Sequence, residues 1–265
     1  MSTSDSGTVL AVRCHGPGDV RVEHLPARRP GPGEVALAPL AVGVCGTVPA
    51  RIAYRLPTGT PPWVGALTEP LACCIHGMDQ LAPRSGLPVL VYGAGPAGAM
   101  MVALSRARGL APIVVFDPRP DRRDLALRMG ADAAFDPSDE ASAPAALTDG
   151  LGFPHVIDAV GSGRVLESAV GMASRGGRIL VFGVARPDDE ARVRPNEIFA
   201  RELTIVGAVI NPYTQHRAVG MLPTLGLDRL RPAFFPLEKV PQALDVLAVG
   251  QADKLFIAPQ GVEAA

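Results

Sequence analysis

A glycine-rich segment is the part of this chain whose residue types and spacing point most directly to chemistry. Gly93-Ala94-Gly95-Pro96-Ala97-Gly98 follows an apolar run at 88–92 that predicts a β-strand, and it opens a predicted helix at 96–108. The first glycine permits a tight turn, the second lets the backbone approach a pyrophosphate, and the third lets helix and strand pack closely. N–H groups at the start of the helix would bind the phosphates. The segment predicts a dinucleotide site; the alternative is a glycine-rich turn without a ligand.

An acidic residue lies where such a site requires one. Asp117 ends the next predicted strand, 19 residues after Gly98, where a carboxylate accepts hydrogen bonds from the adenosine ribose. Because a carboxylate repels a 2′-phosphate, we expect NAD rather than NADP. Arg119, Arg122 and Arg123 follow directly, and they either bind that phosphate, which leaves NADP open, or form a solvated helix start.

The elements that must position these groups alternate from about residue 66. Predicted strands lie at 88–92, 113–117, 133–135, 155–159, 178–183 and 203–209, with helices at 66–80, 96–108, 119–129 and 165–173. Thr68 is the expected N-cap of the first helix. Such alternation specifies parallel strands joined by right-handed crossovers, so the fold class is α/β with a doubly wound Rossmann sheet.

The N-terminal part has a different pattern. Residues 8–47 contain short β-prone runs separated by turns at 16–19 and 29–33, and 34–44 predicts a further strand. Residues 48–65 are rich in Pro, Gly and Thr and predict a connector, while 241–248 and 255–258 predict a last helix and a last strand. We expect a β-rich domain at 1–70, to which 235–265 returns, and a Rossmann domain at 71–234.

Composition limits the class of protein. The chain has 265 residues, of which 48% are hydrophobic and 19% charged, with a formal net charge of −1. This balance is typical of a soluble globular protein with no nucleic-acid partner, which would need a basic excess. The polar start, the absence of a long apolar run and four cysteines without disulfide spacing favour a cytoplasmic protein with no membrane contact.

The chain resembles the zinc-type medium-chain dehydrogenase/reductase family, particularly its polyol and threonine dehydrogenase-like branch. The resemblance rests on segments in family order: Pro30-Gly-Pro-Gly-Glu34, Val42-Gly-Val-Cys-Gly-Thr47, Glu69-Pro-Leu-Ala72, the glycine segment, Asp158-Ala-Val-Gly161, Gly176-Gly-Arg-Ile-Leu-Val-Phe-Gly183 and Asn211-Pro-Tyr-Thr214. It implies a GroES-like N-terminal domain, a bound NAD(P), a small-molecule substrate and a homodimer joined near the edge strand at 203–209.

The sequence departs from the family after Thr47. There the family has a long stretch with its Gly-His-Glu zinc ligands and a four-cysteine structural lobe, whereas Thr47 runs straight into Val48-Pro-Ala-Arg51. Of the family's catalytic ligands only Cys45 and Glu69 remain. Catalytic zinc needs about three protein ligands, so we expect neither catalytic nor structural zinc. A rebuilt site from Cys45, Cys73, Cys74 and His76 is the alternative; otherwise the last three pack against the sheet.

The resemblance also implies site residues. Cys45, Thr47 and Glu69 are the catalytic candidates, with Thr47 bonding the substrate oxygen, and Tyr54 and Tyr213 are further possible proton donors. The expected coenzyme contacts outside the glycine segment are Asp117, Arg122, Val160, Gly161, Phe182, Gly183, Val184, Val209, Ile210, Asn211 and Lys254. Most of these end successive predicted strands, at the edge where open α/β sheets bind ligands.

Together these features predict a zinc-independent, NAD(P)-dependent oxidoreductase. It would transfer hydride to or from a carbonyl, enone or imine. The substrate would be a small-molecule biosynthetic intermediate with a bulky structure. The alternatives are an enzyme that uses bound NAD without net redox change, such as an epimerase, cyclase or eliminating enzyme, and a non-catalytic dinucleotide-binding protein.

Overall fold

The computed structural model describes residues 7–16, 19–27, 42–43, 54–140, 147–249 and 252–261. The chain divides into two compact units, one formed by Met1–Ala50, Pro61–Ala66 and Arg231–Ala265, the other by Arg51–Thr60 and Leu67–Leu230. Across the described ranges, no helix combines the length and apolar character that crossing a membrane requires.

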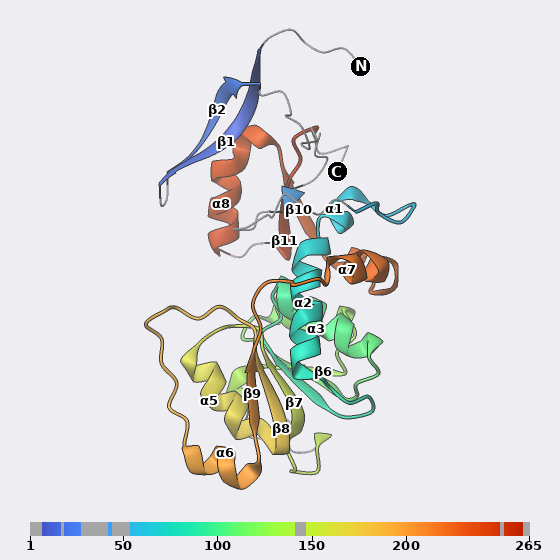
Figure 1. Cartoon of the computed structure of the whole chain (residues 1–265), viewed down its shortest axis with the longest axis vertical. Helices are drawn as coiled ribbons and strands as arrows, with labels where there is room; N and C mark the ends of the chain where they lie inside the picture. Colours follow the sequence, from blue (N-terminus) through green and yellow to red (C-terminus); the bar gives the residue numbers. More distant parts are fainter. Residues whose placement is uncertain are drawn as a thin grey trace. The chain divides into compact units, whose positions relative to one another are not determined.

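The larger unit is built on six parallel strands (Figure 1). They are β4 (Val89–Tyr92), β5 (Ile113–Phe116), β6 (Ala133–Phe135), β7 (Phe153–Asp158), β8 (Ala173–Val181) and β9 (Thr204–Gly207). Their order in the sheet is β6-β5-β4-β7-β8-β9. The chain proceeds outward from β4 in one direction and then from β7 in the other, so the order reverses between these two strands. The predicted doubly wound Rossmann sheet is confirmed.

Helices cover both faces of this sheet. They are α2 (Thr68–Leu81), α3 (Pro96–Ala107), α4 (Pro120–Arg128), α5 (Gly163–Met172), α6 (Pro195–Arg201) and α7 (Gln215–Met221), with short 3-10 turns at Pro137–Asp139, Leu222–Thr224 and Leu227–Arg229. In Figure 1, α5 lies on one side of the strands and α2 and α3 on the other. All four residues of β4 and of β5 are buried, which explains why these strands are continuous apolar runs.

Several predicted boundaries are wrong. The residue that caps α2 is Leu67, and Thr68 is already helical and only 7% exposed, so it does not act as the N-cap. β8 begins at Ala173, where a helix end was expected, because Ala173 already pairs with Phe153 of β7; a register shift that contains Gly176, with φ 70°, separates this pair from the pairing that resumes at Arg178. The short helices α6 and α7 were not predicted; each has only seven residues, too few to establish an apolar periodicity.

The smaller unit contains two small sheets. β1 (Thr8–Gly16) and β2 (Asp19–Pro26) form an antiparallel hairpin that reverses direction at the turn predicted for 16–19. The second sheet has the order β10-β11-β3, from Pro232–Phe235, Lys254–Ile257 and Val42–Gly43. Helices α1 (Pro62–Gly65) and α8 (Val240–Val249) and a 3-10 turn at Leu237–Lys239 complete this unit. Helix α1 lies where a connector was expected, and most of the strand expected at 34–44 lies outside the described residues.

Candidate functional site

The glycine segment forms a tight turn between β4 and α3. Gly93 has φ 88°, a left-handed conformation that favours glycine, and its N–H donates to the carbonyl of Phe116 at 2.7 Å. A Cβ atom on Gly98 would overlap the carbonyl oxygen of Gly93, so α3 can approach the turn only because Gly98 has no side chain. Gly95 precedes the helix without a side-chain cap. This arrangement fits a pyrophosphate, which backbone N–H groups at a helix start bind.

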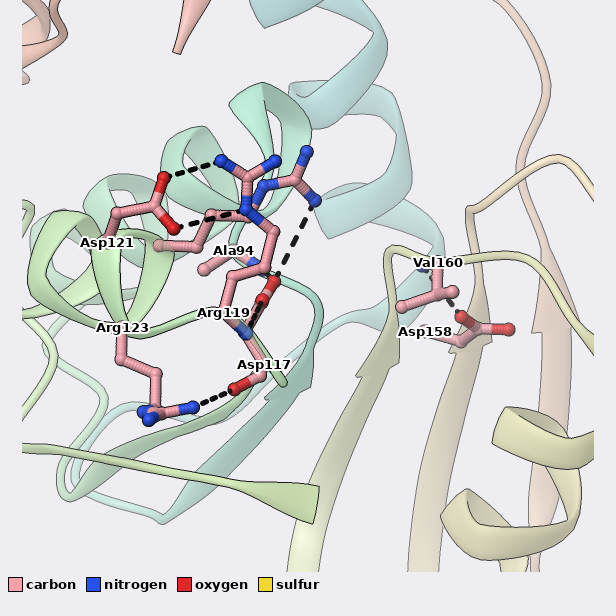
Figure 2. A network of polar contacts seen from close by, with 8 residues as sticks. Ala94, Asp117, Arg119, Asp121, Arg123, Asp158 and Val160 are labelled. Atoms are coloured by element: carbon pink, nitrogen blue, oxygen red, sulfur yellow. Dashed lines mark hydrogen bonds and ion pairs between the residues drawn. The ribbon is translucent and has the colours of Figure 1, made fainter. Parts of the chain in front are cut away.

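Asp117 lies one strand away and is bonded to this turn (Figure 2). Its Oδ2 accepts a hydrogen bond from the Ala94 N–H at 2.8 Å, and its Oδ1 accepts one from the Arg119 N–H at 2.9 Å. The residue is only 2% exposed. Its carboxylate therefore holds the glycine turn against the end of β5. A ribose hydroxyl would reach it only after neighbouring side chains move, so the ribose contact stays a prediction.

The three arginines after Asp117 have different partners. Arg119 bonds Asp121 through two nitrogens, at 3.1 and 2.6 Å. Arg123 donates to the backbone carbonyl of Asp117 at 2.8 Å and to Asp136 at 3.1 Å. Arg122 lies 4.0 Å from Asp117 Oδ2, and a Cβ on Gly95 would be 3.7 Å from its Nη1. Of the three guanidinium groups, that of Arg122 is therefore placed beside the glycine turn.

Two further strand ends approach each other closely. Asp158 ends β7, and its Oδ1 accepts hydrogen bonds from the N–H groups of Val160 and Gly161, both at 2.9 Å. Burial raises the pKa of Asp158, and these backbone hydrogen bonds oppose the rise. A Cβ on Gly161, which has φ 80°, would come within 2.5 Å of the Gly183 backbone.

The predicted coenzyme residues of the loops after β7 and β8 thus lie side by side. Val160 and Val184 are 49% and 93% exposed there, and Phe182 is half-buried. The structural role of Asp158 was not foreseen, although an acid at a strand end followed by a glycine is a usable signal in the sequence.

The structure also brings Glu69 and Asn211 together, although they are far apart in the chain. Asn211 Nδ2 donates to Glu69 Oε1 at 2.9 Å and lies 3.5 Å from Cys73 Sγ. The Cys73 thiol donates to the same Glu69 oxygen at 3.3 Å. A predicted catalytic residue on α2 and a predicted coenzyme residue after β9 therefore share one hydrogen-bonded cluster. No motif signals this contact, because 142 residues separate the two side chains.

A pocket of about 550 Å³ lies beside this cluster. It is lined mainly by apolar and aromatic side chains: Tyr54, Val209, Ile210, Asn211, Pro212, Tyr213, Gln215 and His216. Tyr213 is 93% exposed, and Ile210 and Tyr213 both have left-handed backbone conformations, with φ 61° and 59°. The two phenols predicted as possible proton donors thus lie around one apolar pocket of a size that binds small molecules.

Three other predicted residues lie outside the described part of the larger unit. Cys45 and Thr47 lie outside the described residues, and Lys254 begins β11 in the smaller unit. Cys74 is buried, and its thiol lies 3.8 Å from the Ala97 carbonyl, which matches the packing interpretation. Within the described ranges, no three His, Cys, Asp or Glu side chains are grouped to hold a metal, so these residues alone do not fit a zinc ion.

Comparison with known proteins places the chain in a family. The family profile described as zinc-binding dehydrogenase matches residues 96–225. D-arabinitol dehydrogenase 1 of Uromyces fabae is 31% identical over 202 residues, covering 73% of this chain and 57% of that protein. L-threonine 3-dehydrogenase of Bacillus licheniformis is 29% identical, covering 80% of this chain and 62% of that protein.

A solved structure agrees with these matches. A protein of Sinorhizobium meliloti 1021 that is described as a zinc-binding dehydrogenase, with NADP bound, is 30% identical and has a TM-score of 0.73. The match covers 80% of this chain and 64% of that one. The chain thus spans 57–64% of the length of these three relatives. Its motifs, its sheet and these relatives agree: this chain belongs to the zinc-binding family of medium-chain dehydrogenases and reductases.

Proposed function

We propose that this chain binds NAD(P) along the carboxyl edge of its six-stranded sheet and transfers hydride between that coenzyme and a small molecule. One observation carries the proposal. The turn that begins at Gly93 leads into α3 at the point where the strand order reverses, it has no room for a side chain at Gly93 or Gly98, and the Asp117 carboxylate is hydrogen-bonded to it. Open α/β sheets bind ligands at this position. The backbone N–H groups of Ala97 and Gly98 would hold the pyrophosphate.

The coenzyme supplies or accepts the hydride, and the groups around Asp117 bear on whether it is NAD or NADP. A carboxylate at this strand end supports NAD. The burial of Asp117 weakens that preference, because the charge is turned toward the protein rather than toward a ligand. Arg122 beside the glycine turn supports NADP as well. We therefore propose NAD as the coenzyme, with NADP accepted.

The reaction we propose needs no zinc, because the stretch that carries the family's Gly-His-Glu ligands has no counterpart after Thr47. A developing alkoxide then needs a proton donor from the protein. Glu69 in its protonated form is the proposed donor, since Asn211 and Cys73 both bond its Oε1 and fix the side chain near the start of α2. Cys45 and Thr47 are the other candidates.

The substrate we propose is a carbonyl, enone or imine with a bulky, apolar substituent. The pocket lined by Tyr54, Val209, Ile210 and Tyr213 supports this class, because its walls are largely apolar. An intermediate of a specialised biosynthetic pathway would have both features. Residues 1–70 and 235–265 would form a shortened catalytic domain and 71–234 the coenzyme domain.

We also propose a homodimer that forms along β9. This strand is at the edge of the six-stranded sheet, and Ile205 on it is 36% exposed. An unpaired strand edge is a template for pairing with a second chain. Gel filtration that gives the mass of a monomer would contradict this part of the proposal.

The test is a hydride-transfer assay on the purified chain with its metal content measured. NADH or NADPH is mixed with a series of ketones, enones and imines of increasing apolar size, and the reduced-nicotinamide absorbance is followed. We expect turnover without stoichiometric zinc and a loss of about 100-fold or more in Glu69→Gln. Turnover only with zinc would contradict zinc independence, and NAD that co-purifies and remains unchanged during catalysis would indicate the non-redox alternative.

A further inference from the structure

The loop between β9 and α7, residues 208–214, has an inverted pattern of burial. Its apolar side chains are outside: Val209 is 76% exposed, Ile210 59% and Tyr213 93%. Its polar side chains are inside, with Asn211 6% and Thr214 4% exposed. Polar residues are normally the exposed ones. The folding of the loop therefore does not by itself explain why its apolar side chains are outside and its polar side chains inside.

The two buried polar side chains hold the loop to α2. Asn211 Nδ2 donates to Glu69 Oε1 at 2.9 Å, and Thr214 Oγ1 donates to the carbonyl of Ala72 at 2.8 Å. Buried polar groups need such partners, because an unsatisfied one costs the free energy of its lost hydration. The loop is therefore fixed at two points to the first two turns of α2.

The backbone next to these two anchor residues is strained. Ile210 and Tyr213 have φ 61° and 59°, in the left-handed region. A β-branched residue such as Ile is rarely found there, and such conformations persist only where the surroundings impose them. The hydrogen bonds of Asn211 and Thr214 are contacts that can impose the left-handed conformation of Ile210 and Tyr213. Their effect is to keep three apolar side chains displayed at the carboxyl edge of the sheet.

We propose that Asn211 is a positioning residue whose side-chain amide, anchored on α2, holds this loop in the form that receives the nicotinamide end of the coenzyme. The inference rests on the proposed function. In this inference the backbone and the apolar side chains of the loop contact the coenzyme, whereas the task of the Asn211 amide is to hold the loop in place. The same amide fixes Glu69 Oε1, so one side chain sets the place of both the loop and the candidate proton donor.

The experiment compares two ligands that share the adenosine end. 5′-ADP lacks the nicotinamide, whereas NADH has it, and the emission of bound NADH senses the surroundings of its nicotinamide ring. Asn211→Leu removes both donor hydrogens and keeps the branching and the number of heavy atoms of the side chain. Asn196→Leu is the matched control, because Asn196 is exposed on α6. Circular dichroism verifies folding, and Thr214→Val, which removes the second anchor, serves if Asn211→Leu does not fold.

We expect Asn211→Leu to bind NADH about tenfold more weakly and 5′-ADP less than about twofold more weakly. The emission of bound NADH should change, while Asn196→Leu should match the unaltered chain. Unchanged NADH affinity and emission in Asn211→Leu, or an equal loss for both ligands, would overturn the inference, and Thr214→Val is judged by the same criteria. An unaltered chain that binds neither ligand would instead overturn the proposed function, and the inference with it.

Discussion

The two halves of the sheet's carboxyl edge are built in opposite ways. On the side of β4 and β5, Asp117 is 2% exposed, and its carboxylate joins two backbone N–H groups. On the side of β8 and β9, Val184 and Tyr213 are each 93% exposed, and the loop after β9 contains two strained residues. The first half has its polar groups satisfied within the protein, whereas the second displays apolar surface.

The difference shows which half is complete without a ligand. The first half, proposed to bind the adenosine, is made from one turn and the strand beside it, so its geometry exists before anything binds. The second half, proposed to bind the nicotinamide, depends on contacts between α2 and the loop before α7, and a ligand that covered its exposed apolar side chains would lower the free energy. Coenzyme binding should therefore rely on the first half for affinity and on the second for the placement of the reacting end.

The largest effect should come from filling the glycine turn. A side chain at Gly98 would overlap the Gly93 carbonyl, so we expect Gly98→Val to lower NADH affinity by roughly 100-fold or more. Gly171→Ala is the control, because a Cβ there meets nothing within 4 Å and alanine stabilises a helix by about 0.5–1 kcal/mol relative to glycine. Titration calorimetry measures both. A folded Gly98→Val that binds NADH normally would refute the assigned role of the turn.

A smaller effect should follow from changing the acceptor at Asp117. Its two oxygens each accept one backbone N–H, so Asp117→Asn must turn an NH2 group toward one of these donors. An unsatisfied buried donor costs about 1–3 kcal/mol, which should appear as a lower free energy of unfolding in urea. NADH affinity should fall with it. If Asp117→Asn is as stable as the unaltered chain, the carboxylate does not hold the turn.

The next change separates the coenzymes. Arg122 lies beside the glycine turn, whereas Arg119 and Arg123 are bonded to Asp121 and Asp136. We expect Arg122→Ala to weaken NADPH binding by about three- to tenfold and NADH binding by less than about twofold. Arg119→Ala is the matched control and should leave the ratio of the two affinities unchanged. An equal loss for both coenzymes in Arg122→Ala would exclude a role in selecting the 2′-phosphate.

The smallest effect is expected at Asp158, at the junction of the two halves. The N–H groups of Val160 and Gly161 bond the same oxygen, Oδ1, so Asp158→Asn can retain these two bonds while it removes a buried charge. Burial raises the pKa of Asp158 above its unfolded value, so its stabilising contribution is present at low pH and is lost as pH rises through the folded-state pKa.

Asp158→Asn should therefore gain stability relative to the unaltered chain as pH rises above about 4, by no more than about 1 kcal/mol. Thermal unfolding at a series of pH values between 3 and 8 measures this gain. A variant that is less stable than the unaltered chain at pH 7 would show that the charge itself is needed. Together, Asp158→Asn and Asp117→Asn compare what the carboxylates of two acids at strand ends contribute to stability.

The sequence predicted the first half better than the second for a physical reason. The glycine turn, Asp117 and the four-residue strands β4 and β5 are local signals, because each depends on residues a few positions apart. That Asp117 is buried and bonds the N–H groups of Ala94 and Arg119 depends on the folded backbone, which no spacing reveals. The Asn211–Glu69 bond joins residues 142 positions apart, and a single sequence contains no periodicity at that distance.

The family resemblance added what local signals lacked. It placed Val160, Gly183 and Asn211 at one edge by their motifs, and the structure shows them at successive strand ends of the same sheet. It could not supply the cap of α2, since Leu67 is fully buried and makes no side-chain cap hydrogen bond that its residue type would signal. Nor could it foresee the exposed apolar loop, whose form depends on two buried hydrogen bonds to α2.

The central claim is that the turn at Gly93–Gly98 binds a nicotinamide dinucleotide. Isothermal titration calorimetry of the full chain with NADH, followed by displacement with 5′-ADP, tests it most directly. We predict saturable binding of one NADH per chain that 5′-ADP displaces competitively. No heat with NADH or NADPH, or binding that 5′-ADP leaves untouched, would contradict the claim.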